Sequence, residues 1–178
     1  MSEKDEGATT EPIDLEPQFA ALQASQDRIC AIFFAIANHQ DWQPHPDEWS
    51  FRYIAAHMAQ VELDCHLRRV LEISAGEKPH YSYYLNTGWD FSSYDIQDSI
   101  STWRERRNEV VMTLRRLDSI QLNLTATHEH FGEIKAVDVL KLALDHDKEH
   151  ENHLNEVMKS FDAGEGQYAL HGTVADSS

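Results

Sequence analysis

The sequence predicts an all-α fold, a four-helix bundle in up-down-down-up order, and three observations support this prediction. Four segments place apolar residues at the three- and four-residue spacing of amphipathic helices. The chain has 178 residues, 41% of them hydrophobic, which is enough for the core of one domain. A long connection, from Gly76 to Asp95, separates the second and third segments. Because it can cross the bundle from end to end, we expect these two helices to run parallel.

Charge and apolar patterning argue against several classes of partner. The formal net charge of -16 disfavours nucleic acids and anionic membrane surfaces, because both are bound through Lys and Arg. No apolar run is long enough for a transmembrane helix, and the N-terminus lacks the apolar segment of a secretory signal. Cys30 and Cys65 form no C-x-x-C motif. We therefore expect two reduced thiols in a cytoplasmic protein.

We expect one bundle domain over residues 17–161, between flexible tails at residues 1–16 and 162–178. The first helix should begin at Pro17, a residue suited to a first helical turn, and end near Asn38. Its apolar face consists of Phe19, Leu22, Ile29, Phe33 and Ile36.

The second helix should run from Phe51 to Ser74, after a loop that Trp42 and Trp49 anchor on the core. Ser50 is a suitable N-cap for this helix. The apolar stripe contains Ile54, Met58, Val61, Cys65 and Leu71.

His57 falls within or beside this stripe, so its ring should point toward the core. It could be a core histidine that the backbone or Asp64 satisfies, or a metal ligand with Asp64, seven residues on, as its hydrogen-bond partner. His66 lies nine residues after His57, about half a turn away, and should face solvent.

The third helix should begin at an Asp95 cap and end at about Leu117. Arg107 lies inside its apolar stripe, where a guanidinium must be paired. Its partner is either a carboxylate on a neighbouring helix or an anionic substrate. The aromatic residues of the connection before this helix could wall a pocket or cover the core.

The fourth helix, from Val137 to Lys159, follows a connection in which His128 and His130 should be solvated. In this helix, three histidines occupy positions of the apolar stripe: His146, His150 and His153. Steps of four and three residues return to one helical face, and two histidines four residues apart can bind one metal ion. Alternatively, these rings are solvated or hydrogen-bonded in the core.

A third ligand from another helix would complete a metal site, and His57 can supply it. Ligand sites in helical bundles are built from side chains on facing helices. Three neutral imidazoles leave a coordination position open and suit zinc or nickel, although iron and copper also accept nitrogen ligands. His153 lies one further turn along, so we expect it to hold a carboxylate or move a proton beside the metal.

Two stretches resemble the DinB/YfiT-like family of metal-dependent proteins, and the resemblance extends over about residues 15–160. They are WSFRYIAAHMAQVE, at 49–62, and FGEIKAVDVLKLALDHDKEHENHLNEV, at 131–157. The resemblance implies a four-helix bundle, often dimeric, with a metal-binding triad at His57, His146 and His150. Some members of this family transfer low-molecular-weight thiols or isomerise thiol adducts.

The expected function is therefore a metal-dependent enzyme that activates a thiol or water for transfer to an electrophile or for hydrolysis. Its partners would be a small-molecule substrate, for which a low-molecular-weight thiol is one candidate, and a second copy of the chain. The candidate catalytic residues are His153, Arg107 and Asp64. One alternative is a non-catalytic metal-binding or stress-related bundle with a vestigial triad. A carboxylate-bridged di-metal protein is less favoured, because Asp147-x-x-His150 has no second copy.

Overall fold

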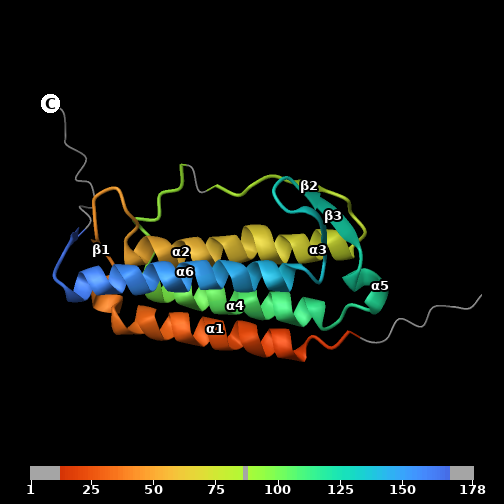
Figure 1. Cartoon of the computed structure of the whole chain (residues 1–178), viewed down its shortest axis with the longest axis horizontal. Helices are drawn as coiled ribbons and strands as arrows, with labels where there is room; N and C mark the ends of the chain where they lie inside the picture. Colours follow the sequence, from red (N-terminus) through yellow and green to blue (C-terminus); the bar gives the residue numbers. More distant parts are fainter. Residues whose placement is uncertain (1–12, 86–87, 169–178) are drawn as a thin grey trace, which may run out of the picture.

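The computed structural model describes residues 13–85 and 88–168, which form a bundle of four long helices (Figure 1). The first is α1 (Glu16–Ala35), which a 3-10 turn, η1 (Ala37–His39), follows. The second is continuous but composite: α2 (Phe51–Val61), a π-helical turn η2 (Glu62–Leu67) and α3 (Arg68–Ser74). The third and fourth are α4 (Ile96–Leu114) and α6 (Val139–Asp162), with a short helix α5 (Ser119–Leu122) between them.

The course of the chain can be followed by colour in Figure 1. Helix α1 runs from right to left, and α2 and α3 return from left to right. Helix α4 also runs from left to right, and α6 runs back to the left. The described parts of the connection between α3 and α4, residues 75–85 and 88–95, lie along one side of the bundle, and α4 begins at the same end of the bundle as α2.

The helix starts follow the local sequence. The Ser50 hydroxyl accepts a hydrogen bond from the Tyr53 N–H at 3.3 Å, and Asp95 accepts one from the Gln97 N–H at 2.8 Å. These contacts satisfy backbone donors that have no partner within the first helical turn. Helix α1 begins at Glu16, one residue before the proline at which the sequence predicts its start.

Two small sheets occur that the sequence analysis does not anticipate. Strand β1 (Trp42–Gln43) pairs antiparallel with β5 (Gln167–Tyr168). Strand β2 (His80–Tyr81) pairs parallel with β3 (Thr125–His128), which forms an antiparallel hairpin with β4 (Gly132–Lys135). Strand β5 lies within the predicted C-terminal tail, and α6 extends into that tail by one residue. The remainder of this tail, residues 169–178, and residues 1–12 of the N-terminal tail lie outside the described residues.

The connection before α6 is therefore a folded hairpin rather than an open loop. Ala126, His128 and Ile134 are buried on one face of it, while Thr127, Glu133 and Lys135 are exposed. Gly132 opens β4 with a φ of +73°, a conformation that side-chain-bearing residues rarely adopt. The prediction that His128 is solvated is wrong, because the alternation of the strand turns its ring into the protein.

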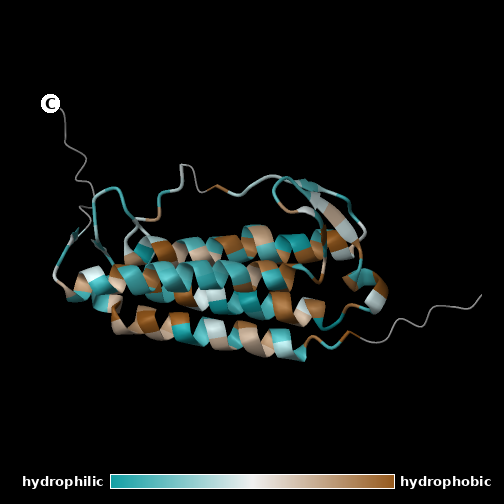
Figure 2. Ribbon diagram, in the orientation of Figure 1, coloured by the Kyte–Doolittle hydropathy of each residue, from teal (hydrophilic) through white to brown (hydrophobic). Residues whose placement is uncertain are grey.

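Two apolar clusters fill the bundle, and a layer of buried polar side chains lies between them, uncharged in α1 (Ser25 and Gln26) and charged at Glu62, Arg107 and Asp147. One cluster joins the end of α1, α2, the start of α4 and the end of α6, with Phe33, Phe51 and Trp103 among its largest buried residues. The other joins the opposite halves of the helices around Leu22 and Val110. The visible face of α6 is largely hydrophilic (Figure 2). Among the described helices, none is both long and apolar enough to cross a membrane.

Candidate metal centre

The π-helical turn η2 determines which side chains of the second helix reach the centre of the molecule. An α-helix advances about 100° per residue, so His66 would lie about half a turn from His57. A π turn holds one extra residue and rotates everything after it by about 100° relative to an uninterrupted helix. His66 is accordingly buried, with 2% of its surface exposed, and the prediction that it faces solvent is wrong. Leu71, predicted in the apolar stripe, is 50% exposed for the same reason.

Three histidines, one from α2 and two from α6, converge inside the bundle. Each occupies a position in or beside the apolar stripe of its helix, as the sequence predicts. One nitrogen from each of His57, His146 and His150 lies within 4.8 Å of the other two. The Nε2 atoms of His57 and His146 are 3.2 Å apart. Two nitrogens bound to one tetrahedral zinc, each at about 2.0–2.1 Å, would be separated by roughly 3.4 Å. The spacing of this pair therefore suits a shared ion.

Two histidines of the triad, His146 and His150, are held in the neutral form that metal binding requires. Burial, reinforced by the nearby His57 and His153, lowers the pKa of His150 to about 3. Burial is also the largest cause that lowers the pKa of His146 well below its ordinary value, followed by the neighbouring His150 and His66. A charged imidazole loses solvation when it is buried, so both rings keep a free lone pair at neutral pH.

One nitrogen of the triad has no partner among the described residues. The Nδ1 atom of His150 is buried and makes no hydrogen bond there. An unsatisfied buried nitrogen costs free energy unless water or an ion pairs with it. Together with the spacing and the neutral rings of His146 and His150, this atom shows that the residues present fit a divalent metal ion.

Trp49 and His153 surround the triad without joining it. The Trp49 ring lies 4.8 Å from the His57 ring and stacks on the His150 ring at 6.0 Å, measured between centroids. Trp49 is thus a wall of the candidate centre and not only the loop anchor that the sequence suggests. His153 lies 6.4 Å from His150, centroid to centroid, and is absent from the convergent group.

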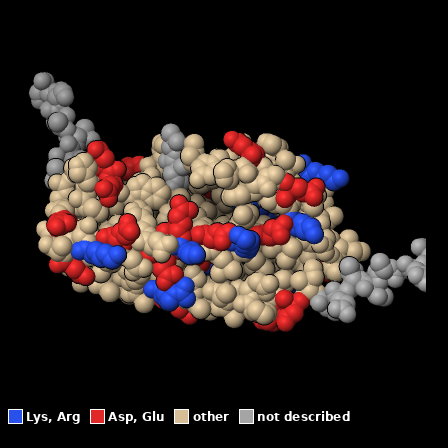
Figure 3. Space-filling model, viewed as in Figure 1, with Lys and Arg blue, Asp and Glu red and all other residues tan. Residues whose placement is uncertain are grey.

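The triad opens onto a cavity of about 520 Å³. In the space-filling view a hollow lies above the band of charged side chains that crosses α6 (Figure 3). Besides the triad and Trp49, the cavity is lined by Val61, Cys65, His66, Arg69, Tyr83, Tyr84, Leu85, His128, His130, Phe131, Leu142, Asp145 and Glu149. The start of the aromatic connection therefore walls the cavity. Its later part covers the core, since Phe91 is buried and packs edge-on against Tyr53.

Arg107 is paired with protein carboxylates and is not available to a substrate. Its Nε and Nη2 atoms donate to Glu62 at 2.7 and 2.8 Å, and its Nη1 and Nη2 atoms donate to Asp147 at 2.9 Å each. All three side chains are buried. Of the two kinds of partner that the sequence allows, the structure shows carboxylates on neighbouring helices. The two ion pairs join η2, α4 and α6, and Asp147 is adjacent to His146 in the sequence.

Glu62 also fixes His66. The His66 Nδ1 atom lies 3.1 Å from Glu62 Oε2, and the Trp103 indole N–H donates to the same oxygen at 3.3 Å. Burial alone would raise the pKa of Glu62, but Arg107 and His66 outweigh it and hold that pKa at about 2. Sequence reasoning missed this carboxylate, although Glu62 lies four residues after Met58, on the apolar stripe.

Asp64 does not take the role that its spacing suggests. Its carboxylate accepts hydrogen bonds from the Gln60 amide at 2.7 Å and the Tyr84 hydroxyl at 3.0 Å. Asp64 thus ties the helix to the aromatic connection.

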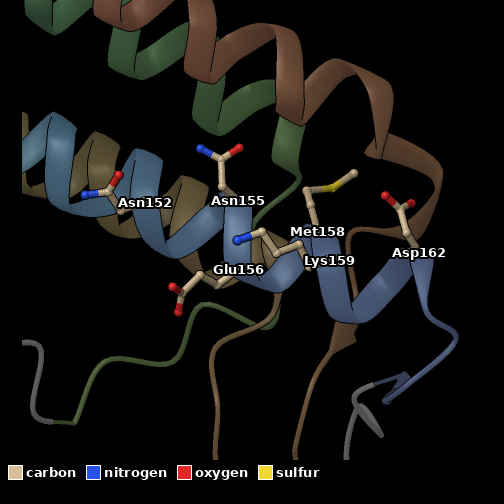
Figure 4. Close-up of a pocket in the computed structure, with 6 residues that line it drawn as sticks. All are labelled: Asn152, Asn155, Glu156, Met158, Lys159 and Asp162. Atoms are coloured by element: carbon tan, nitrogen blue, oxygen red, sulfur yellow. The ribbon is translucent and has the colours of Figure 1, made fainter.

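A second hollow lies on the surface of α6 and is more open than the cavity at the triad. All six residues at its border come from the C-terminal half of this helix: Asn152, Asn155, Glu156, Met158, Lys159 and Asp162 (Figure 4).

The fold and the site together define a class: a helical bundle whose interior presents a histidine triad suited to one divalent ion. The family model of the DinB superfamily matches residues 37–154, more than half of the chain, and the chain belongs to this superfamily.

Two solved structures from Bacillus subtilis share the fold. YfiT, described as a probable metal-dependent hydrolase with an unusual four-helix bundle topology, aligns with a TM-score of 0.65 and 19% identity. The alignment covers 87% of this chain and 92% of YfiT. The DinB-like protein YjoA aligns with a TM-score of 0.53 and 13% identity, over 87% of this chain and 97% of YjoA. A search of curated proteins finds no match.

Proposed function

We propose that this chain is a metal-dependent enzyme in which His57, His146 and His150 hold one divalent ion, zinc or nickel. One observation carries the proposal: the three imidazoles converge at an open cavity. Closed structural zinc sites use four protein ligands, whereas catalytic sites use three and leave a position for water or substrate. A triad that faces a cavity favours catalysis over a vestigial or purely structural role.

The proposed reaction is attack by a thiol or water on an electrophilic small molecule. A bound ion would lower the pKa of a coordinated thiol or water to near neutrality and so supply the nucleophile. The buried imidazoles stay neutral and keep their lone pairs for the ion. Trp49 excludes water from one side of the triad, and His153, beside His150, is placed to exchange a proton with solvent.

Comparison supports a hydrolytic reaction, and the sequence resemblance supports a thiol. YfiT is described as a probable metal-dependent hydrolase. Low-molecular-weight thiols are substrates of some proteins that the chain resembles.

The proposal also includes a cytoplasmic location and a homodimer. Light scattering of the purified protein at tens of micromolar tests the dimer, and a monomer there would exclude it.

The function is tested with protein purified without chelator or nickel resin. Elemental analysis should find about one zinc or nickel ion per chain. Cobalt-loaded protein should show the visible absorption of a four-coordinate ion, and 2-mercaptoethanol should add a sulfur-to-cobalt band. Protein that binds no stoichiometric metal would overturn the proposal. Cobalt absorption that thiols leave unchanged would exclude the thiol reaction and leave hydrolysis.

A further inference from the structure

A second buried arginine lies on the wall of the cavity that holds the triad. Arg69 is 7% exposed, and its side chain lines the cavity together with His57, His146 and His150. The π turn brings it there: twelve residues after His57, it lies within about 20° of the same helical face once the extra residue is counted. In an uninterrupted α-helix the two residues would be about 120° apart.

Unlike Arg107, Arg69 has no carboxylate partner in the described part of the chain. Within residues 13–85 and 88–168, none of the ion pairs closer than 4.0 Å includes it. The nearest acidic residue along the helix, Glu72, already binds the Arg68 guanidinium at 2.7 Å and the Tyr81 hydroxyl at 2.9 Å. Buried guanidinium groups are normally paired, so this one lacks its counter-charge.

His128 provides only weak compensation. The Nη2 atom of Arg69 lies 3.1 Å from His128 Nε2. The backbone N–H groups of His130 and Phe131 point at the other ring nitrogen, Nδ1, at 3.1 and 3.4 Å. Burial and the adjacent Arg69 lower the pKa of His128, so the ring is neutral. A neutral imidazole accepts at one nitrogen only and cannot satisfy both sets of donors.

The guanidinium is nevertheless held in place and accessible. It lies over the Tyr81 ring, 5.3 Å from the centroid. Among the described residues, the only hydrogen-bond contact of the guanidinium is that of Nη2 with His128, and Nε and Nη1 retain solvent access, because neither is among the buried unsatisfied atoms. An oriented cation with free donors on a cavity wall is a receptor for an anion.

We propose that Arg69 receives the carboxylate of the small molecule whose other end binds at the histidine triad. The assignment rests on the proposed function for the metal-bound end only. The planar guanidinium fork matches a carboxylate through two parallel hydrogen bonds. Asp145 and Glu149 also line the cavity, so a singly charged group is favoured over a doubly charged phosphate.

The separation of the two groups sets the shape of the ligand. Twelve residues correspond to roughly 18 Å between the backbones of His57 and Arg69, but the triad extends toward Arg69, because the His146 ring lies 5.6 Å from the ring of His66, three residues before Arg69. The ligand is therefore an extended molecule, with the nucleophilic or electrophilic group at one end and the carboxylate at the other.

The test compares two thiols that differ only at the far end, 8-mercaptooctanoate and 8-mercapto-1-octanol, by calorimetry on zinc-loaded protein. The wild type should bind the carboxylate at least tenfold more tightly than the alcohol. Arg69→Met should abolish this preference and change the affinity for the alcohol less than threefold. Arg68→Met is the matched control, because Arg68 is a 60% exposed neighbour, and it should keep the preference. Arg69→Gln serves as a second variant if Arg69→Met does not fold.

A metal-free arm separates this proposal from the proposed function. Octanoate should bind the metal-free wild type and should bind at least fivefold more weakly to Arg69→Met, whether or not the triad holds zinc. Equal binding of octanoate by both proteins, or a carboxylate preference that survives in Arg69→Met, would overturn the role of Arg69. Tighter binding of inorganic phosphate than of octanoate would overturn the choice of carboxylate.

Discussion

Glu62 is the residue on which the buried polar contacts of the bundle converge. Its carboxylate accepts from Arg107 through both oxygens and from the Trp103 indole, and it holds one side of the His66 ring. A buried ion pair contributes little when it is compared with an apolar replacement, but removal of one partner is costly. The expected consequence is that single substitutions in this group harm stability far more than surface substitutions do.

We predict that Glu62→Gln lowers the free energy of unfolding at pH 7 by about 3–5 kcal/mol. The folded-state pKa of about 2 lies below the ordinary value of 4.5, so ionised Glu62 stabilises the fold above about pH 4.5. That contribution disappears as the pH falls through this range toward 2. Urea unfolding at pH 5 and pH 3 should show the gap between wild type and variant shrink by about 2 kcal/mol. A gap that does not change with pH would contradict the assigned ionisation.

For single residues, the sequence predicts a buried functional or paired side chain where a polar residue interrupts an apolar stripe. The histidines in the apolar stripes of two helices are such interruptions, and the structure brings the three predicted rings together. Arg107 is another, and its pairing is as expected. The acidic partners were not predicted individually, because Asp147 and Glu62 resemble the many solvated carboxylates of a chain with 31 acidic residues.

At the scale of elements, the π turn has the largest effect on the site. It rotates α3 so that Arg69, Val70 and Ile73 are buried while Leu71 is half exposed. Periodicity analysis assumes 3.6 residues per turn throughout and cannot reveal a single extra residue. The short strands escaped prediction for a related reason, since two to four residues give too little alternation to recognise.

Two neighbouring residues test which face of α3 the π turn directs toward the core. Val70→Ala should lower the free energy of unfolding by about 2 kcal/mol, because Val70 is 0% exposed. Leu71→Ala should change it by less than about 0.5 kcal/mol, since half of that side chain already contacts solvent. Chemical denaturation measures both. The opposite order, with Leu71→Ala the more damaging, would mean that the helix continues without the π turn.

For the whole molecule, periodicity and length were sufficient to predict a helical bundle, because four amphipathic segments have few ways to bury their apolar faces. The cavity was not predictable in this way. It forms where the aromatic connection, the β3–β4 hairpin, α2 and α6 meet, and such contacts depend on tertiary packing. Charged side chains of both signs alternate across α6 below it (Figure 3). Among the lining residues, Asp145 and Glu149 are each adjacent in the sequence to a triad histidine and favour a metal cation there, whereas Arg69 provides the positive charge elsewhere on the wall.

The central claim is that one metal ion binds to His57, His146 and His150, and equilibrium dialysis of four single variants against zinc tests it most directly. His57→Ala, His146→Ala and His150→Ala should each weaken binding at least tenfold, because two remaining imidazoles hold zinc poorly. His153→Ala is the matched control, since it removes a histidine from the same helix that lies outside the convergent group. It should bind about one zinc per chain with wild-type affinity. If His153→Ala lost zinc as completely as His146→Ala, or if no variant lost it, the assigned metal centre would be wrong.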